Sequence, residues 1–400
     1  MVAAIRDAAF AVDAAAVMKL LATRPQLLAL GEPVHGEDDL LALRNDLFRE
    51  LVEREHFRII AIESDCLMGL VVDEYVTSGT GTLDEVMERG FSHGFGAFAG
   101  NRELVRWMRD YNDGRPASEQ LRFAGFDGPL EISGAASPRQ ALTGLHAYLA
   151  ARVDADELPC PAGLLDDLLG ADQRWMNPAA MMDPSQSVGR TPEAERLRRL
   201  ADELVALLDE RAPHLLATSS REEWERARLY GRTATGLLEY HFWMAEPSPI
   251  RMNRLLAQRE SMMAANLVAL AERGPTLAHG HNGHLQRDES SMDTADAPLE
   301  WASAGMHVAS QLADRYKLIT TAVGTIRHRG VDAPPADTVE GILYGVPLDR
   351  YLVDARRLGA LLDGASPTAR VSPWFGYSPL DPANVASNDA LVFVRDVAAS

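Results

Sequence analysis

Apolar residues recur along the chain in short runs, and several of these runs end in a charged or imidazole side chain. LLALGEPVHG leads to Glu32 and His35, FRIIAIESD to Glu63, LRFAGFD to Asp127, and GPTLAHGHNGH to His279, His281 and His284. Runs of about four to eight apolar residues bounded by Gly, Pro or Asp are typical of strands buried on both faces of a parallel sheet. Because ligands bind outside the carboxyl ends of such strands, the pattern predicts that these side chains meet in one pocket of an enzyme.

The spacing of apolar positions between the runs predicts the neighbouring elements. The first part of the chain alternates between a helix to about Ala22, a strand at 27–30, a helix at 38–55 and a strand at 57–62. Alternation of this kind is typical of right-handed crossovers and a parallel sheet. Further strands are predicted at 275–279, 317–325 and 389–397, so that strands come from both ends of the chain.

Long helical patterns without an evident strand fill the middle of the chain. In TPEAERLRRLADELVALLDERA, Thr191 stands in the N-cap position before Pro192. A polar loop is expected at 181–190, and a loop-rich segment around one helix near 348–362 is expected at 331–388.

These patterns predict an α/β fold with a central, mostly parallel sheet flanked by helices and an inserted all-helical lobe. We expect 1–139 and 273–400 to form a discontinuous catalytic domain, and 140–272 to form the lobe that covers the active-site cleft.

Composition narrows the class of partner. A formal net charge of -19 over 400 residues argues against nucleic acid and anionic lipid, which bind clustered Lys and Arg. The chain has no apolar window long enough for a membrane span, and acids interrupt its apolar start, unlike a signal peptide. Cys66 and Cys160 are too few for a disulfide framework, so a cytoplasmic protein with a small-molecule substrate is expected; the sequence does not give the oligomeric state.

The segment GEPVHGEDD presents Glu32 and His35 as they leave a strand. A carboxylate three residues from an imidazole can orient the ring and support it as a general base. The alternative is a pair of ordinary turn or N-cap residues.

Arg44 and Glu63 give the second indication of a site. Arg44 lies in the apolar stripe of its predicted helix, four residues from both Leu40 and Phe48. A guanidinium on a buried face needs an anionic partner or a wet cavity, and Glu63 or Glu32 is the expected partner. A structural ion pair is the alternative for Arg44, and a solvated cap is the alternative for Glu63.

The histidines of AHGHNGH offer oxyanion donors, a second acid or base, or metal ligands. Glu32, His35, Glu63, His281 and His284 together match the ligand types of zinc, but no compact metal signature is present, and a neighbouring Arg44 would oppose a cation. No cofactor is therefore the expectation, with a metal as the alternative.

Weaker site candidates lie in turns and loops. Asp127 in GFDG and His93 in GFSHGFGAFAGN are candidate substrate-binding residues, although GFDG is also an ordinary turn sequence. Other histidines, among them His146, His214 and His328, lie in contexts typical of surface or core positions. Serine-hydrolase elbows, phosphate loops and dinucleotide fingerprints are missing from the strand-to-helix turns.

The chain resembles the erythromycin esterase family, which also includes proteins related to succinoglycan biosynthesis. The likeness lies in LGEPVHG, LFRELVEREHFRIIAIESD, NRELVRWMRDYN, FAGFD, RESMMAANLVALAERG, AHGHNGHL and NDALVFVRDV, and spans about residues 28–396. The resemblance implies an α/β protein with a helical lobe that cleaves a lactone by activated water without a covalent serine intermediate.

Carried over by motif position, the resemblance makes His35 the general base, with Glu32 and Glu63 as its carboxylate neighbours. Arg44 becomes the buried cation, His281 a second site imidazole and Arg259 a lobe-side substrate contact. His284, Asp127 and His93 are further substrate-binding candidates. The family usually has Thr at the position of Val34, aromatics at those of Leu40 and Leu41, and Trp before the HN pair, so the resemblance points to a substrate other than a macrolide.

The leading hypothesis is a hydrolase that cleaves an ester or lactone of a fairly large, mostly apolar metabolite bound between the sheet edge and the lobe. His35 would deprotonate water, and Arg44, Arg259 or His281 would stabilise the oxyanion. A cyclase, lyase or isomerase that uses the same base is the second hypothesis, and a metal or haem binding protein is the third.

Overall fold

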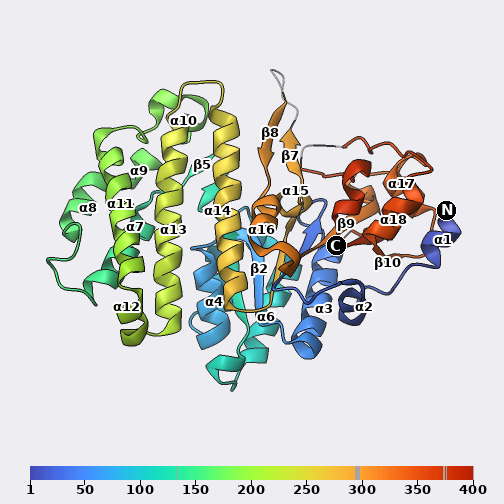
Figure 1. Cartoon of the computed structure of the whole chain (residues 1–400), viewed down its shortest axis with the longest axis horizontal. Coiled ribbons are helices and arrows are strands. Elements are labelled where there is room, and N and C mark those ends of the chain that lie inside the picture. Colours follow the sequence, from blue (N-terminus) through green and yellow to red (C-terminus); the bar gives the residue numbers. More distant parts are fainter. Residues whose placement is uncertain (132, 293–297, 373, 375, 400) are drawn as a thin grey trace. The chain divides into compact units, whose positions relative to one another are not determined.

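The computed structural model describes residues 1–131, 133–292, 298–372, 374 and 376–399 (Figure 1). These residues divide into two compact units. Unit 1 comprises the described residues of Met1–Phe126, Leu267–Asp293 and Glu300–Ser400, and unit 2 comprises those of Asp127–Asn266 and Thr294–Leu299. Unit 1 therefore draws on both ends of the chain.

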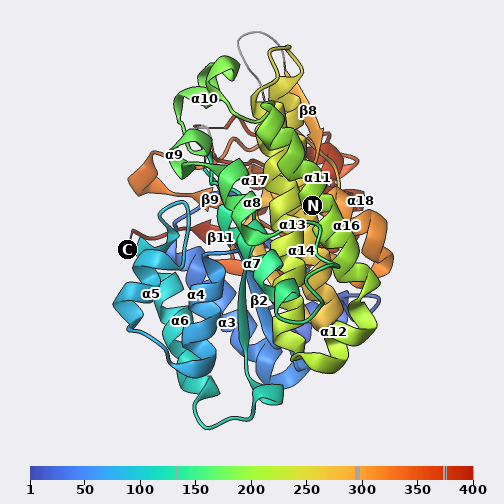
Figure 2. The ribbon, with the colours of Figure 1, turned by 90° about the vertical axis from the view of Figure 1, so that its left-hand side faces the viewer.

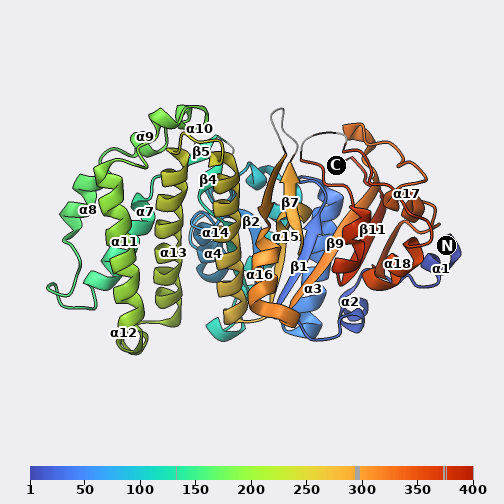
Figure 3. The same ribbon diagram turned by 45° about the horizontal axis from the view of Figure 1, so that its top comes forward.

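Seven strands form one sheet in the part of the chain that the structure describes, in the order β10-β11-β9-β1-β6-β2-β3. They are β1 Leu27–Glu32, β2 Ile59–Asp65, β3 Arg122–Asp127, β6 Thr276–His281, β9 Tyr316–Thr325, β10 Arg350–Asp354 and β11 Ala390–Asp396. The pairs β11–β9, β9–β1, β1–β6 and β6–β2 are parallel, while β10 and β11 are antiparallel. Figure 3 shows β1, β9 and β11 side by side. The predicted mostly parallel α/β sheet is confirmed.

Helices cover both faces of this sheet, and its strands are therefore buried on both sides. On one face, Leu28, Ile60 and Leu277 pack against apolar residues of α2, α3, α4 and α6. On the other face, Val353 and Phe393 pack in a second core with residues of α1, α17 and α18. The helices of unit 1 are α1 Val2–Arg6, α2 Ala14–Leu20, α3 Asp38–Glu55, α4 Gly69–Ser78, α5 Leu83–Arg89, α6 Ala99–Asn112, α15 Asn282–Leu285, α16 Ala304–Leu312, α17 Val339–Tyr344 and α18 Ala355–Leu362. Figure 2 shows α4, α5 and α6 packed together.

Unit 2 is mainly helical, and α7, α11 and α13 run side by side in it (Figures 1 and 3). Its helices are α7 Arg139–Ala150, α8 Ala162–Leu169, α9 Asp172–Trp175, α10 Ala179–Met182, α11 Pro192–Glu210, α12 Ala212–Thr218 and α13 Arg221–Met244. A short hairpin, β4 Leu130–Glu131 with β5 Gly134–Ala135, precedes them. The predicted N-cap is confirmed, since Thr191 accepts a hydrogen bond from the N–H of Ala194.

Two connecting elements complete the chain. Helix α14, Arg251–Arg273, begins in unit 2 and ends in unit 1. Strands β7 Glu289–Met292 and β8 Leu299–Ala302 pair as a two-stranded sheet that the sequence did not predict.

Three sequence predictions about single elements were wrong. The helix expected to Ala22 is two short helices, because the Asp13 side chain accepts the N–H of Ala16 and starts α2 anew. The helix expected near 348–362 begins as β10, since pairing with β11 overrides the helical spacing, and Asp354 then caps α18. The loop expected at 181–190 contains the end of α10 and the short 3-10 helix Pro184–Gln186.

Candidate active site

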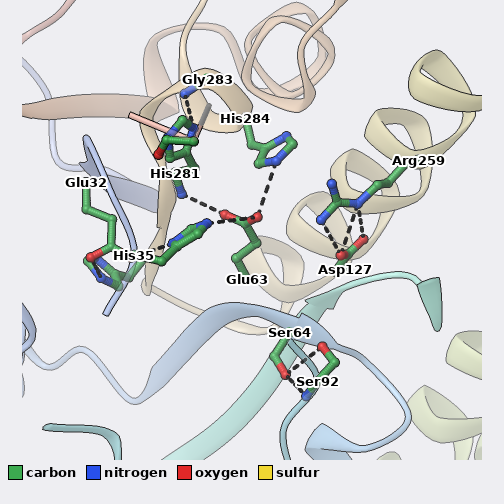
Figure 4. Close-up of polar contacts among 12 residues, drawn as sticks. Glu32, His35, Glu63, Ser64, Ser92, Asp127, Arg259, His281, Gly283 and His284 are labelled. Atoms are coloured by element: carbon green, nitrogen blue, oxygen red, sulfur yellow. Dashed lines mark hydrogen bonds and ion pairs between the residues drawn. The ribbon is translucent and has the colours of Figure 1, made fainter. Parts of the chain in front are cut away.

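The carboxyl ends of three neighbouring parallel strands place the acidic and imidazole side chains of unit 1 together (Figure 4). Glu32 ends β1 and is the register partner of His281, which ends β6. Glu63 lies near the end of β2, the strand on the other side of β6. The predicted meeting of these strand ends therefore occurs.

Strand alternation places the two carboxylates on different faces of the sheet. Glu32 shares a face with Leu28 and Leu30, which pack toward α3. Glu63 lies on the opposite face, where a Cβ added to Gly280 would come within 2.8 Å of Glu63 Oε2. Only glycine at position 280 leaves the carboxylate this room.

His35 lies between the two carboxylates, in the turn that links β1 to α3. Its Nδ1 donates a hydrogen bond to Glu32 Oε1 at 2.8 Å, and its Nε2 lies 3.6 Å from Glu63 Oε1. Burial acts to lower the pKa of His35, but the charge of Glu63 and the contacts with Glu32 outweigh it and raise the pKa to about 10. His35 is therefore an imidazolium at neutral pH in the free protein.

Glu63 connects several groups at the strand ends. Its Oε2 accepts the backbone N–H of His281 at 2.6 Å, and its Oε1 lies 3.2 Å from His284 Nε2. Burial acts to raise the pKa of Glu63, but the positive charges of His284 and His35 hold the pKa well below its usual range. In the same way, contacts with His279 and His35 outweigh burial and hold the pKa of Glu32 well below its usual range. Both carboxylates are therefore ionised across the ordinary pH range.

His281 is held as a neutral ring. Its Nε2 donates to the carbonyl of Gly376 at 3.3 Å, and its Nδ1 accepts the N–H of Gly283 at 3.3 Å. Burial, aided by repulsion from the His35 ring 5.3 Å away, lowers the pKa of His281 to about 4. Its N–H is engaged by Gly376, so the ring must turn before it can serve the predicted role of oxyanion donor.

Arg44 is fully buried as predicted, but its predicted carboxylate partner was wrong. The guanidinium donates to Asn45 Oδ1 at 2.8 Å and to Asn101 Oδ1 at 2.8 Å, and no described carboxylate lies within ion-pair distance. Burial lowers the pKa of Arg44 to about 10, although the charge of Glu32 acts in the opposite direction. Its amide partners come from α3 and α6. Arg44 therefore interacts with Glu32 through the charges of the two groups and not through a direct contact.

The loop before α6 supplies an aromatic wall. Ser92 fixes this loop to the end of β2, because its N–H donates to Ser64 Oγ at 2.9 Å and its Oγ accepts the N–H of Asp65 at 2.8 Å. Phe95 then lies with its ring centroid 5.0 Å from that of His35. His93 lies next to Phe95, at 5.7 Å between ring centroids.

Asp127 and Arg259 form their own pair in unit 2. Arg259 donates to Asp127 through Nε and Nη2, with a shortest distance of 2.7 Å, and Asp127 is fully buried. The Gly128 N–H adds a further bond to Asp127 Oδ1 at 2.7 Å. The two residues are thus joined to each other, and their predicted contact with substrate stays a prediction.

Sequence reasoning gave His279 only a role shared with the other histidines of AHGHNGH, and it gave Glu37 none. His279 lies with Nε2 3.3 Å from Glu32 Oε2. Buried Glu37, which precedes α3, pairs with Arg329 Nε at 2.6 Å and His328 Nε2 at 3.0 Å. The alternation of His279 with His281 was visible in the sequence, but the register with β1 that places it against Glu32 was not.

The metal alternative has a geometric test. Among the described His, Cys, Asp and Glu side chains, none form a group of three or more arranged to hold a metal ion.

Residues 52–397 match the family model described as erythromycin esterase. The chain belongs to the erythromycin esterase family. The matched range begins downstream of Glu32, His35 and Arg44.

Three solved structures have a fold similar to that of this member of the erythromycin esterase family. A Bacillus cereus protein has a TM-score of 0.74 and 18% identity, covering 99% of this chain and 97% of its own. A succinoglycan biosynthesis protein has a TM-score of 0.70 and 16% identity, covering 99% and 96%. A mutant of the erythromycin esterase EreC in its open conformation has a TM-score of 0.67 and 18% identity, covering 96% and 93%. Among curated proteins, none matches significantly.

Membership of the erythromycin esterase family supports a hydrolase that acts on a small molecule. None of the helices in the described part of the chain has the length and apolar character needed to cross a membrane.

Proposed function

We propose that the protein hydrolyses an ester or lactone of a fairly large, mostly apolar metabolite, with His35 activating the attacking water. The observation that carries this proposal is the position of His35 between Glu32, at 2.8 Å from Nδ1, and Glu63, at 3.6 Å from Nε2. A carboxylate on Nδ1 fixes the tautomer and leaves Nε2 to exchange a proton with water.

In the proposed reaction, deprotonated His35 Nε2 takes a proton from water while the water oxygen attacks the carbonyl carbon. The imidazolium that forms is stabilised by Glu32 and Glu63. Collapse of the tetrahedral intermediate breaks the bond to the alkoxide oxygen, and His35 returns its proton to that oxygen. The products are a carboxylic acid and an alcohol, and the enzyme forms no covalent bond to the substrate.

The raised pKa of His35 lowers the fraction of the basic form at neutral pH and increases the strength of that base. At neutral pH only a small fraction of the free enzyme carries the basic form, which limits the rate. A base whose pKa is about 10 is, however, a strong acceptor of the proton of water once it is deprotonated. The substrate must therefore bind to the deprotonated form or displace the His35 proton.

The charge state of the site favours one second candidate. The imidazolium can donate a proton and an ionised carboxylate beside it can remove one, so the pair can act without water, as a cyclase, lyase or isomerase requires. Product mass separates this chemistry from hydrolysis.

The test is a mass-spectrometric turnover screen of esters and lactones in heavy-oxygen water, with macrolides included because EreC is named an erythromycin esterase. A product that gains one labelled water, formed by the wild type and His214→Ala but lost in His35→Ala, supports the hydrolase. His214 is a matched control, since it is an exposed histidine of unit 2 that bonds the carbonyl of Arg152. A product of unchanged composition would instead establish the second candidate.

Elemental analysis and a visible spectrum of the same preparation test the metal and haem hypothesis. Stoichiometric metal or a haem band, together with no turnover, would replace the hydrolase proposal.

A further inference from the structure

His279 is a buried histidine to which the proposed reaction assigns no step. It lies within β6, is 3% exposed and is the register partner of Leu30 on β1. Its Nδ1 lies 3.0 Å from the carbonyl oxygen of Leu30. A carbonyl oxygen only accepts, so the proton of a neutral His279 ring must lie on Nδ1.

This tautomer creates a conflict at the other nitrogen. His279 Nε2 lies 3.3 Å from Glu32 Oε2, and neither atom has another hydrogen-bond partner among the described residues. A neutral ring and an ionised carboxylate would direct two lone pairs at each other in a buried site, which is costly. Because Glu32 is ionised, one additional proton on His279 Nε2 converts this repulsion into a charge-assisted hydrogen bond.

The surroundings keep that proton from exchanging easily. Glu32 and His279 border a small cavity of about 10 Å³, room for roughly one water, which is also lined by Arg44, Glu63 and Asn101. Arg44 and Glu63 carry opposite charges there, and His35 contacts the far oxygen of Glu32. Bulk solvent has little access to these side chains. The exposed fraction is no more than 3% for each of Glu32, Arg44, Glu63 and His279.

We propose that His279 is a positioning residue that keeps one proton on its contact with Glu32 and so fixes the charge and orientation of the carboxylate that binds His35. The two carboxylates and three imidazoles then form one alternating chain, His279–Glu32–His35–Glu63–His284, which passes around the carboxyl edge of the sheet from one face to the other. The influence of His279 on catalysis rests on the proposed function, but its influence on His35 does not.

The substitution His279→Gln separates the proton from the hydrogen bond. A glutamine amide can still donate to Glu32, but it cannot carry a second proton. Because Glu32 is ionised, loss of the His279 proton leaves its carboxylate with unshared negative charge. The titration of His35, followed by magnetic resonance of isotope-labelled histidine, should therefore move upward by about one pH unit or more.

His146→Gln is the matched control, because His146 is also a buried histidine that bonds a backbone carbonyl, that of Cys160 at 2.9 Å, but it forms no ion pair with a described carboxylate. His35 should titrate in this variant as in the wild type. If His35 also titrates unchanged in His279→Gln, the proposal is overturned, whatever the enzyme is found to hydrolyse.

Activity gives an independent readout once a substrate is known. The acidic limb of the kcat/KM profile should shift with the His35 titration in His279→Gln, with kcat reduced about tenfold near neutral pH and KM little changed. If the wild type shows no hydrolysis, the proposed function fails while the magnetic resonance experiment still decides the role of His279.

A measurement on the wild type covers the case in which His279→Gln does not fold. In the wild type, His279 Nε2 should carry a proton that it donates to Glu32, and the ring nitrogen shifts report this state. A bare Nε2 in the folded protein would overturn the proposal.

Discussion

The backbone N–H of His281 donates to Glu63 Oε2 at 2.6 Å, so one side chain of β2 closes the end of its neighbour β6. The same carboxylate faces His35 and His284 through its other oxygen. Glu63 thus has a structural and an electrostatic task at once, and substitutions can separate the two.

Glu63→Gln should remove the charge of this side chain and keep most of its shape. Because the charge of Glu63 is the largest contribution that raises the pKa of His35, that pKa should fall by about one unit or more. At a pH near or above 10, where most of His35 is basic in both proteins, we expect kcat/KM to fall by roughly a hundredfold, since the imidazolium formed in the reaction loses a counter-charge. A histidine titration and steady-state kinetics measure the two effects, and an unmoved His35 would contradict the assignment.

The reaction rate should depend on pH through His35. If its basic form takes a proton from water, kcat/KM should rise as the pH increases and level off near the raised pKa of about 10. A bell-shaped profile centred near neutral pH would argue that another group is the base. Rates should be measured only where the protein remains folded.

Folding stability should follow the same groups with a defined sign. The pKa of His35 is raised on folding, so its contribution is fully present below about pH 6.5 and is lost as the pH rises toward 10. The pKa values of Glu32 and Glu63 are lowered on folding, so their contribution is present above about pH 4.5 and is lost in acid. Chemical denaturation as a function of pH should show this window, and His35→Ala should flatten its alkaline side.

Arg44→Met should destabilise the fold by about 3 to 5 kcal/mol. The substitution leaves Asn45 Oδ1, Asn101 Oδ1 and nearby backbone oxygen without their buried cationic donor. Arg49→Met, one turn later on α3, removes ion pairs at a side chain that is 28% exposed and should cost less than about 1 kcal/mol. Equal midpoints of urea unfolding for the two variants would show that burial of Arg44 carries no special weight.

Gly280→Ala should reduce activity more than it reduces stability. The new Cβ would lie 2.8 Å from Glu63 Oε2 and 2.9 Å from the Phe126 ring, so Glu63 must shift. We expect at least about a tenfold loss of kcat, because displacements of this size disturb catalytic geometry. Gly163→Ala in α8 has open space at its Cβ and should leave kcat unchanged, with slightly raised thermal stability.

Much of the fold and part of the site followed from local pattern. The runs that end in Glu32 and Glu63 were long and apolar enough to be read as buried strands, and parallel strands place their ends together. The apolar stripe that contains Arg44 likewise predicted its burial. These features depend on residues close in sequence.

What failed depends on partners distant in sequence. The acceptors of Arg44 include Asn101, whose position depends on how α6 packs against α3, and no periodicity in α3 reports this. Strand β10 exists because it pairs with β11, which lies some forty residues later along the chain. His279 was visible as a histidine, but its role depends on the alignment of β6 with β1.

That alignment also determines which insertions and deletions the protein can tolerate without losing its site. Residue 30 pairs with 279 and residue 32 with 281, and a one-residue slip in a strand turns every later side chain to the other face. Deletion of one residue within β1 would therefore turn Glu32 to the other face and break its contacts with His279 and His35, although none of these residues is substituted. Inherited length changes should be confined to the loops, and the two strands should keep their lengths even in descendants that have changed substrate.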